Sequence, residues 1–279
     1  MKYRLGLAFL IMVLAMALAA GCSDGKQDVA INGKLQDGLY MVKGYIEHDS
    51  FGMASMEVID GDISSFKYSE IIATTGEEKN EDNYSDNTEV LTVIEDLNEQ
   101  FNKKKDIDEI DYDVITGCTK TKETFEELTN ELLAKAEAGD TYRPFYKDGE
   151  YNAKADEDNY GWLGEVNIVI RDGQIVGVDY FEAAIRKLKS SKAILDEHGN
   201  PELDDDGNRK TESVDVEVGE RKSIENYNYI ELFDTIEAVQ KLVINSNGVE
   251  YLDVDVVTGS TGSKDIMIEL IETALKEAK

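Results

Sequence analysis

Two stretches of nearly identical sequence, one in each half of the chain, constrain the fold more than any other feature. Residues 113–119 read Asp-Val-Ile-Thr-Gly-Cys-Thr, and residues 255–261 read Asp-Val-Val-Thr-Gly-Ser-Thr. The preceding patterns repeat as well, because an Asp-Gly pair opens each copy, at residue 37 and at residue 148, an offset of 111 residues. Solenoid repeats have periods of about 20 to 50 residues. The longer period predicts two tandem homologous domains.

Each copy is predicted to contain hairpin strands, a helix, a strand and a second helix, in that order. Asp-Gly pairs at residues 60–61 and 172–173 predict two-residue hairpin turns. Phe51-Gly52 is predicted to be a turn, with residues 160–162 as its counterpart. Apolar spacing predicts helices at 90–101 and 230–244, strands that begin at Ile110 and Leu252, and a helix after each motif. Gly139, just past the helix of the first copy, is predicted to end it. This order indicates an α+β fold with a mainly antiparallel sheet and packed helices in each domain.

Each motif is expected to join the end of a strand to the start of a helix. Thr121 and Ser263 are predicted to be the N-caps of those helices. Free N–H groups and the positive end of the helix dipole favour an anion such as a phosphate at this position. Gly117 and Gly259 permit an unusual backbone conformation. Asp113 and Asp255 are expected to accept hydrogen bonds from N–H groups or hydroxyls of the turn and so to hold the loop rigid. Thr119 and Thr261 offer a hydroxyl at the start of the helix, where a phosphate would lie.

The composition argues against nucleic acid as a partner. The chain has 59 acidic and 29 basic residues, a net charge of −30, and no compensating basic patch. The acidic residues are expected to form a well-solvated surface. No metal site is predicted, because in the run from Asp204 to Gly207 the glycine comes too early for an EF-hand loop and no twelfth-position Glu follows. That run is expected to be a hairpin tip.

The first 22 residues are predicted to be a leader outside the fold. A basic start, an apolar run and the ending Ala-Ala-Gly-Cys resemble a bacterial lipoprotein signal, with Cys22 as the lipid-bearing residue. The alternative is an ordinary secretory signal. Two acyl chains would satisfy the requirement for stable membrane attachment. Residues 23–34 are expected to be a flexible tether, and the domains are expected at 35–140 and 145–279.

The motif threonines are not expected to react unaided. A threonine hydroxyl is a weak nucleophile unless a neighbouring base activates it. The two histidines, His48 and His198, lie far from both motifs in the sequence. A separate enzyme is therefore expected to carry out any modification of these threonines, and the protein itself is not expected to be an enzyme.

Both motifs resemble the signature of the FMN-binding domain family, Asp-x-x-(Ser/Thr)-Gly-Ala-(Ser/Thr). In that family a flavin transferase joins FMN through its phosphate to the last Ser/Thr, and similar domains occur in ion-pumping NADH:quinone oxidoreductases. The resemblance implies two covalent FMN groups, at Thr119 and Thr261. This sequence departs from the signature at the alanine position, where it has two other small residues, Cys118 and Ser260. The cofactor-binding residues that it implies are Asp113, Thr116, Gly117, Cys118, Asp255, Thr258, Gly259 and Ser260.

Two such domains behind a lipoprotein signal are similar to flavinylated surface lipoproteins of Gram-positive extracellular electron transfer. The resemblance implies a lipid-anchored electron carrier on the outer face of the cell membrane. Its partners would be the flavin transferase, a membrane quinone/NADH dehydrogenase system and soluble extracellular acceptors. Two alternatives remain open, a lipoprotein that binds a phosphate-bearing ligand without a covalent bond and a signalling precursor whose leader releases a pheromone peptide. Trp162 is expected to be core rather than a stacking partner of the flavin, and Cys118 a small filler rather than a redox thiol.

Overall fold

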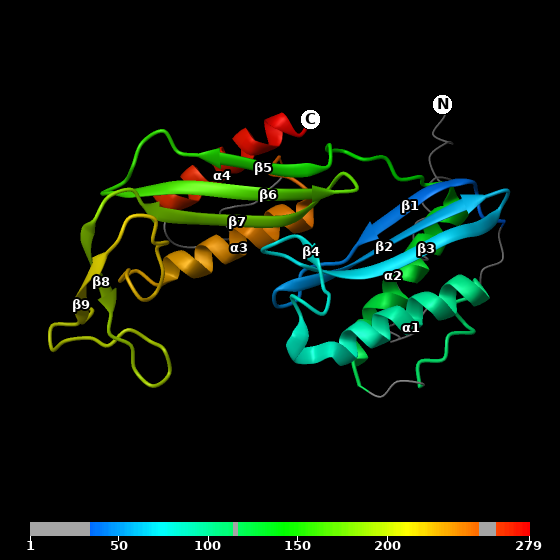
Figure 1. Cartoon of the computed structure of the whole chain (residues 1–279), viewed down its shortest axis with the longest axis horizontal. Coiled ribbons are helices and arrows are strands. Elements are labelled where there is room, and N and C mark those ends of the chain that lie inside the picture. The colour runs from blue at the N-terminus through cyan, green and yellow to red at the C-terminus, as the bar shows by residue number, and fades with distance from the viewer. Residues whose placement is uncertain (1–33, 114–116, 251–260) are drawn as a thin grey trace, which may run out of the picture. The chain divides into compact units, whose positions relative to one another are not determined.

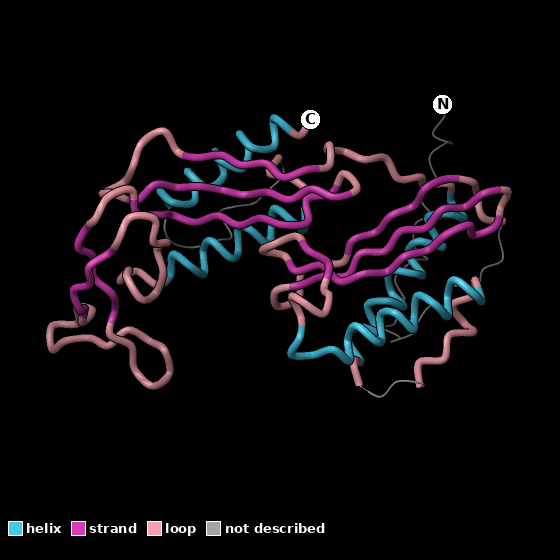
Figure 2. Tube along the Cα trace, viewed as in Figure 1, coloured by secondary structure: helices cyan, strands magenta, loops and turns pink. Residues whose placement is uncertain are grey.

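The computed structural model describes residues 34–113, 117–250 and 261–279, all of which belong to one compact unit. Within these residues the fold is α+β, with three antiparallel sheets and four α-helices (Figures 1 and 2). In chain order the elements are β1 (Gly38–Lys43), β2 (Ser50–Ile59), β3 (Asp62–Ile72), β4 (Glu77–Glu78), a 3₁₀ turn η1 (Ser85–Asn87), α1 (Thr88–Lys104), α2 (Thr119–Ala138), β5 (Gly149–Lys154), β6 (Trp162–Arg171), β7 (Gln174–Ala184), β8 (Leu188–Ala193), β9 (Thr211–Val216), α3 (Glu231–Ser246) and α4 (Thr261–Glu277).

The first sheet has the order β1-β2-β3-β4, and α1 and α2 pack on it. β2 and β3 are joined by the predicted two-residue turn, in which Asp60 and Gly61 have φ of 57° and 84°. The core between sheet and helices is aromatic. Phe125 of α2 meets Tyr68 edge-on at 5.4 Å between ring centroids, and Phe66 lies 4.3 Å from Phe101 of α1. α2 ends at Gly139, with φ of 70°, as the sequence predicts.

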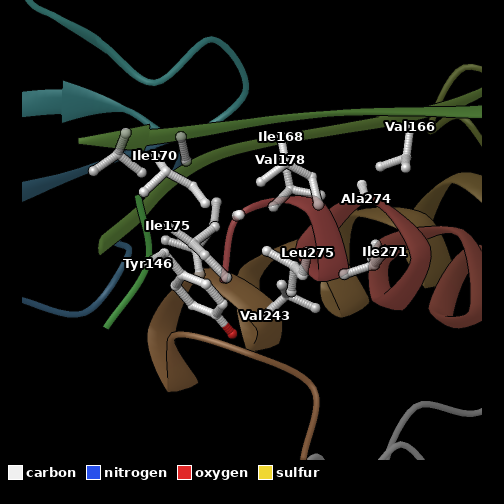
Figure 3. Packing of buried hydrophobic residues seen from close by; sticks show 14 of the residues in the cluster. Tyr146, Val166, Ile168, Ile170, Ile175, Val178, Val243, Ile271, Ala274 and Leu275 are labelled. Atoms are coloured by element: carbon white, nitrogen blue, oxygen red, sulfur yellow. The ribbon is translucent and has the colours of Figure 1, made fainter. Parts of the chain in front are cut away.

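The second sheet has the order β5-β6-β7, and α3 and α4 pack on it. β6 alternates strictly between buried and partly buried residues, as expected for a strand with one face on the core. Figure 3 shows Val166 and Ile168 of this strand beside Ile271 and Ala274 of α4. The same hydrophobic cluster includes Met41, Phe51, Met53 and Ile71 of the first sheet and Ala73, which follows β3.

The charged stretch after β7 contains a third sheet that the sequence pattern did not predict. β8 and β9 pair along six residues, from Leu188 with Val216 to Ala193 with Thr211. Asp204 accepts hydrogen bonds from the N–H groups of Asp206 and Asn208, at 3.0 and 2.8 Å, and Leu203 bridges to Arg209. The prediction of a hairpin tip at residues 204–207 is therefore confirmed.

Several contacts of the first half recur in the second. The carboxylate of Asp37 accepts a hydrogen bond from Gly61 N–H at 2.8 Å, and that of Asp148 accepts one from Gly173 N–H at 2.7 Å. The first and second sheets each have a register shift near the end of an inner strand, between Glu57 and Val58 in β2 and between residues 169 and 170 in β6. These two inner strands therefore correspond at an offset of 112 residues.

This offset corrects the predicted turn at Phe51-Gly52. Both residues lie inside β2, and Gly52 corresponds to Gly164 of β6 rather than to Gly161. The true turns come just before, where Glu47 bridges to Ser50 and Asn159 bridges to Trp162. The predicted strand from Ile110 is also wrong as far as residue 113, since this segment forms turns and coil. Residues 114–116 and the predicted strand at 252–256 lie outside the described residues.

Gly52 and Gly164 form a matched pair for a test of helix-to-sheet packing. A Cβ on Gly52 would lie 2.7 Å from Thr124 Cγ2 and 3.0 Å from Leu128 Cδ1 of α2, whereas a Cβ on Gly164 would lie no closer than 3.1 Å to any atom outside its chain neighbours. Gly52→Ala is expected to destabilise the protein by about 1 to 3 kcal/mol through overpacking. Gly164→Ala is expected to cost less. Urea unfolding of both variants measures the difference, and equal costs would contradict it.

Lys43, at the end of β1, joins the first half of the chain to the second. Its ammonium donates hydrogen bonds to the carbonyl oxygens of Ile175, at 3.1 Å, and Ile244, at 2.5 Å. Ile244 lies in the last turn of α3, where a cation is favourable because the helix dipole places negative charge there. Burial lowers the pKa of Lys43 to about 7, since removal from water penalises the charged form.

This pKa predicts a specific pH dependence of stability. The unfolded chain keeps Lys43 protonated up to about pH 10.5, while the folded protein loses that proton near pH 7. Between these values the unfolded state binds more protons, so the contribution of Lys43 to stability rises with pH, by at most about 1.4 kcal/mol per unit. In Lys43→Met this rise is expected to be absent. Free energies of unfolding measured at pH 6, 7.5 and 9 test it, and parallel curves for the two proteins would contradict the assignment.

Candidate functional site

The first motif leads directly into α2. Gly117 and Cys118 have φ of 89° and 50°, so two consecutive residues take the left-handed conformation before the helix begins at Thr119. The Cys118 side chain makes no capping hydrogen bond. Thr121 is therefore not the N-cap, contrary to the prediction. It lies in the first turn and is buried, because the left-handed turn starts the helix two residues earlier.

Thr119 is exposed at the start of this helix. No acidic residue lies in the first turn of α2, whereas the first turns of α1 and α3 both contain acidic residues. Two lysines lie there instead. Lys120 pairs with Glu47 at 2.9 Å, and the Lys122 ammonium donates to the Tyr112 carbonyl at 2.7 Å. Since a helix N-terminus carries a partial positive charge, this end of α2 is suited to an added anion.

The environment of Cys118 does not favour a reactive thiolate. Burial raises the pKa of the thiol, and the carboxylate of Glu89 raises it further. A thiol in these surroundings remains protonated and weakly nucleophilic. Its side chain packs at the edge of the first hydrophobic core. These observations agree with the interpretation of Cys118 as a small filler.

A cavity of about 580 Å³ lies beside Thr119. Its size is within the range of about 300 to 1,000 Å³ that is typical of small-molecule sites. Gly44 and Gly52 contribute backbone to its wall, and Leu128 of α2 contributes an apolar side chain. The polar lining includes His48, Glu70, Lys79 and Tyr84. Thr119 at the helix start is thus next to a space of the size of a small-molecule site.

Two buried charges line this cavity and were not foreseen from the sequence. The Lys79 ammonium donates to the Glu70 carboxylate at 2.8 Å, and only 6% and 11% of the two side chains are exposed. The hydroxyl of Tyr68 donates to the same carboxylate at 3.2 Å, and the ammonium lies 4.3 Å from the centroid of the Tyr84 ring. Both residues come from a stretch of mixed polar composition, where no spacing distinguishes them from solvated charges.

His48 corrects the expectation that no histidine lies near a motif. It is 71 positions before Thr119 in the sequence, but both residues line the same cavity. The loop before β2 brings His48 there, and its φ of 59° is part of the turn. Asp113 is exposed, and its own N–H donates to Asp111 at 3.0 Å. Thr116 lies outside the described residues.

The second motif is described only where α4 begins. Asp255, Thr258, Gly259 and Ser260 lie outside the described residues, and α4 starts at Thr261. Ser263 is therefore inside the helix rather than its N-cap. The first turn of α4 contains no acidic residue, as in α2. Trp162, at the start of β6, is 5% exposed and packs with Ala184 and Val216, in agreement with its predicted place in the core.

Comparisons with known proteins identify no family. No family model matches the chain, and no curated protein matches it. A solved structure, that of the CPE2226 protein from Clostridium perfringens, aligns with 39% of this chain and 93% of its own length. The aligned sequences are 30% identical, and the TM-score is 0.34. Among the described residues, no helix is both long and apolar enough to cross a membrane.

Proposed function

We propose that this protein is an electron carrier built from two homologous FMN-binding domains, with one FMN joined covalently to Thr119 and one to Thr261. The observation that carries the proposal is the position of Thr119. The residue is exposed at the N-terminus of a helix whose first turn contains no acidic residue, and it adjoins a cavity of about 580 Å³. A phosphoester there would have the positive end of the helix dipole beside it, and the cavity would accept the ring system.

The recurrence of contacts supports a second site of the same kind. Both halves have three long antiparallel strands with two helices packed on them. The Asp-to-Gly hydrogen bond at the hairpin turn and the register shift in an inner strand occur in both. α2 and α4 each begin at a threonine and lack acids in the first turn. Two copies of one domain explain all of these features together.

The residues of the first half fit an FMN group by the chemistry of their donors. The N-terminal N–H groups of α2 and the ammonium of Lys120, which lines the cavity, suit the phosphate, while the walls of the cavity combine apolar side chains such as Leu128 with polar and acidic ones such as Glu89. When bound, the flavin supplies reversible uptake of electrons. The chain contributes attachment, orientation and a surrounding charge that favours one redox state over the other.

The proposal places the protein at the outer face of the cell membrane, anchored through lipid on Cys22. A flavin transferase attaches the FMN groups. Electrons arrive from a membrane quinone/NADH dehydrogenase system and leave to soluble extracellular acceptors. Attachment by a covalent bond is useful in that location, because a cofactor that dissociated outside the cell would not be replaced from the cytosolic pool.

Intact mass analysis tests the proposal. The mature chain, co-expressed with a flavin transferase, is expected to carry two FMN adducts and to stay yellow after denaturation and removal of small molecules. A lipoprotein that binds a phosphate-bearing ligand without a covalent bond would lose both mass and colour in the same treatment. An unmodified mass in the presence of an active transferase would refute the proposal.

The lipid anchor has its own test. Cys22→Ala is expected to release the protein from the membrane into the medium or to block its processing, because the acyl chains can no longer be attached. Fractionation of cells that express the two forms at equal levels measures this. Retention of the processed variant in the membrane fraction would show that another feature holds the protein there.

A further inference from the structure

One cluster of four side chains occurs twice among the described residues with the same contacts. In the first half it consists of Tyr68, Glu70, Lys79 and Tyr84. In the second half the Lys222 ammonium donates to Glu182, the Tyr180 hydroxyl lies 3.4 Å from the same carboxylate, and Lys222 lies 4.3 Å from the centroid of the Tyr227 ring. The corresponding distances around Lys79 and Glu70 are 3.2 and 4.3 Å.

The sequence between the two charges differs greatly in length, but their contact is the same. Glu70 and Lys79 are 9 residues apart, whereas Glu182 and Lys222 are 40 residues apart. The extra segment contains the β8–β9 hairpin. In both halves the lysine N–H donates to the glutamate carbonyl, at 2.8 Å from Lys79 to Glu70 and at 2.7 Å from Lys222 to Glu182. The lysine therefore occupies the corresponding position in both halves, although the segments that connect it to the glutamate differ in length.

Burial of such an ion pair contributes little or nothing to the free energy of folding. The side chains of Lys222 and Glu182 are 5% and 6% exposed. Two charges withdrawn from water lose hydration that their mutual attraction barely offsets, and apolar residues of similar size are often equally stable. Two buried pairs at corresponding positions therefore indicate a role beyond folding. The first pair lines the same cavity as Thr119.

We propose that Lys79 and Lys222 are positioning residues that set the reduction potential of the flavin held in their own half, with Glu70 and Glu182 as opposing charges. This inference rests on the proposed function. A flavin ring gains one negative charge when it takes up two electrons and one proton. An ammonium at the cavity wall stabilises that charge and raises the potential, whereas a carboxylate lowers it, and both effects are strong because the groups are withdrawn from water.

The test uses the Thr261→Ala chain, which carries FMN on Thr119 alone, titrated with dithionite against a reference dye. Lys79→Met is expected to lower the midpoint potential by at least about 30 mV, a tenfold change in the equilibrium for a two-electron couple. Glu70→Gln, which keeps an acceptor for the Tyr68 hydroxyl, is expected to raise it. Opposite signs are the diagnostic result, because a purely structural pair would loosen the site in the same direction in both variants.

Lys67→Met is the matched control. Lys67 also pairs with a glutamate, Glu78, but 60% and 41% of these side chains are exposed and neither lines the Thr119 cavity. The midpoint potential of the Lys67→Met variant is expected to equal that of the parent Thr261→Ala chain. If Lys79→Met fails to fold, Glu70→Gln alone still has to show the upward shift. Adducts of normal mass with unchanged potentials, or shifts of equal sign, would overturn the inference and leave the proposed function standing. A parent chain without any adduct would overturn the proposed function instead.

Discussion

Thr119→Ala is expected to remove one of the two FMN adducts completely, and Thr261→Ala the other, because each substitution deletes the only hydroxyl to which the phosphate of that site would be joined. The double variant should have the mass of the bare polypeptide. Folding should be little affected. Thr119 is exposed at the first position of α2, so its loss is expected to change the free energy of unfolding by less than about 1 kcal/mol.

Thr119→Ser and Thr261→Ser are the controls, since serine keeps the hydroxyl and loses only a methyl group. Both variants are expected to retain two adducts. A further comparison is Thr124→Ala in the second turn of α2, which also lines the cavity and is expected to leave the adduct count at two. Loss of both adducts from one single variant would show that the two sites depend on each other, which the two-domain proposal does not predict.

The sequence predicted those parts of the fold that depend on local chemistry. The Asp-Gly pairs require positive φ at two successive residues, and both hairpins have this geometry at Asp60 and Asp172. Gly139 ends α2 because it takes a left-handed conformation at no steric cost. The helices predicted near residues 90–101 and 230–244 were found because their apolar faces follow the helical period.

The errors have a common physical cause. Glycine next to an aromatic residue suggests a turn, but Gly52 lies inside a strand. It is glycine because α2 packs so closely on the strand that a larger side chain would collide with Thr124. The N-cap was predicted at Thr121 because local rules favour a hydroxyl two residues after the motif, whereas the left-handed turn at Cys118 starts the helix earlier. In both cases tertiary packing or backbone conformation outweighed a short-range preference.

The candidate site was also only partly predictable from local sequence. Thr119 was identified because its motif is contiguous and repeated. Lys79, Glu70 and His48 come together from three separate segments, the stretch after β4, the end of β3 and the loop before β2. Tyr-x-Glu occurs at residues 45–47, 68–70, 180–182 and 229–231, and the copies at 68–70 and 180–182 are separated by the 112 residues that relate the two inner strands, which was the missing signal. Its lysine could not be aligned by spacing, since the β8–β9 hairpin intervenes in one copy.

Reduction of external acceptors should require an attached flavin. Vesicles that carry Thr119→Ala/Thr261→Ala, folded and anchored through Cys22, are expected to reduce ferric complexes or quinones only at the background rate. Either single variant should keep part of the activity. The double serine variant, matched for expression and flavin content, is the control and should react at the wild-type rate.

The charge of the protein makes this expectation more specific. With a net charge of −30, the surface should attract cationic acceptors and repel anionic ones at low salt. The rates for acceptors of opposite charge are expected to converge as ionic strength rises, because exposed charges are screened beyond about 8 Å at physiological salt. In the double variant both acceptors should react only at the background rate at every ionic strength. Wild-type rates in vesicles of that variant, with no parallel route for electrons, would exclude the carrier function and favour a non-covalent binding protein.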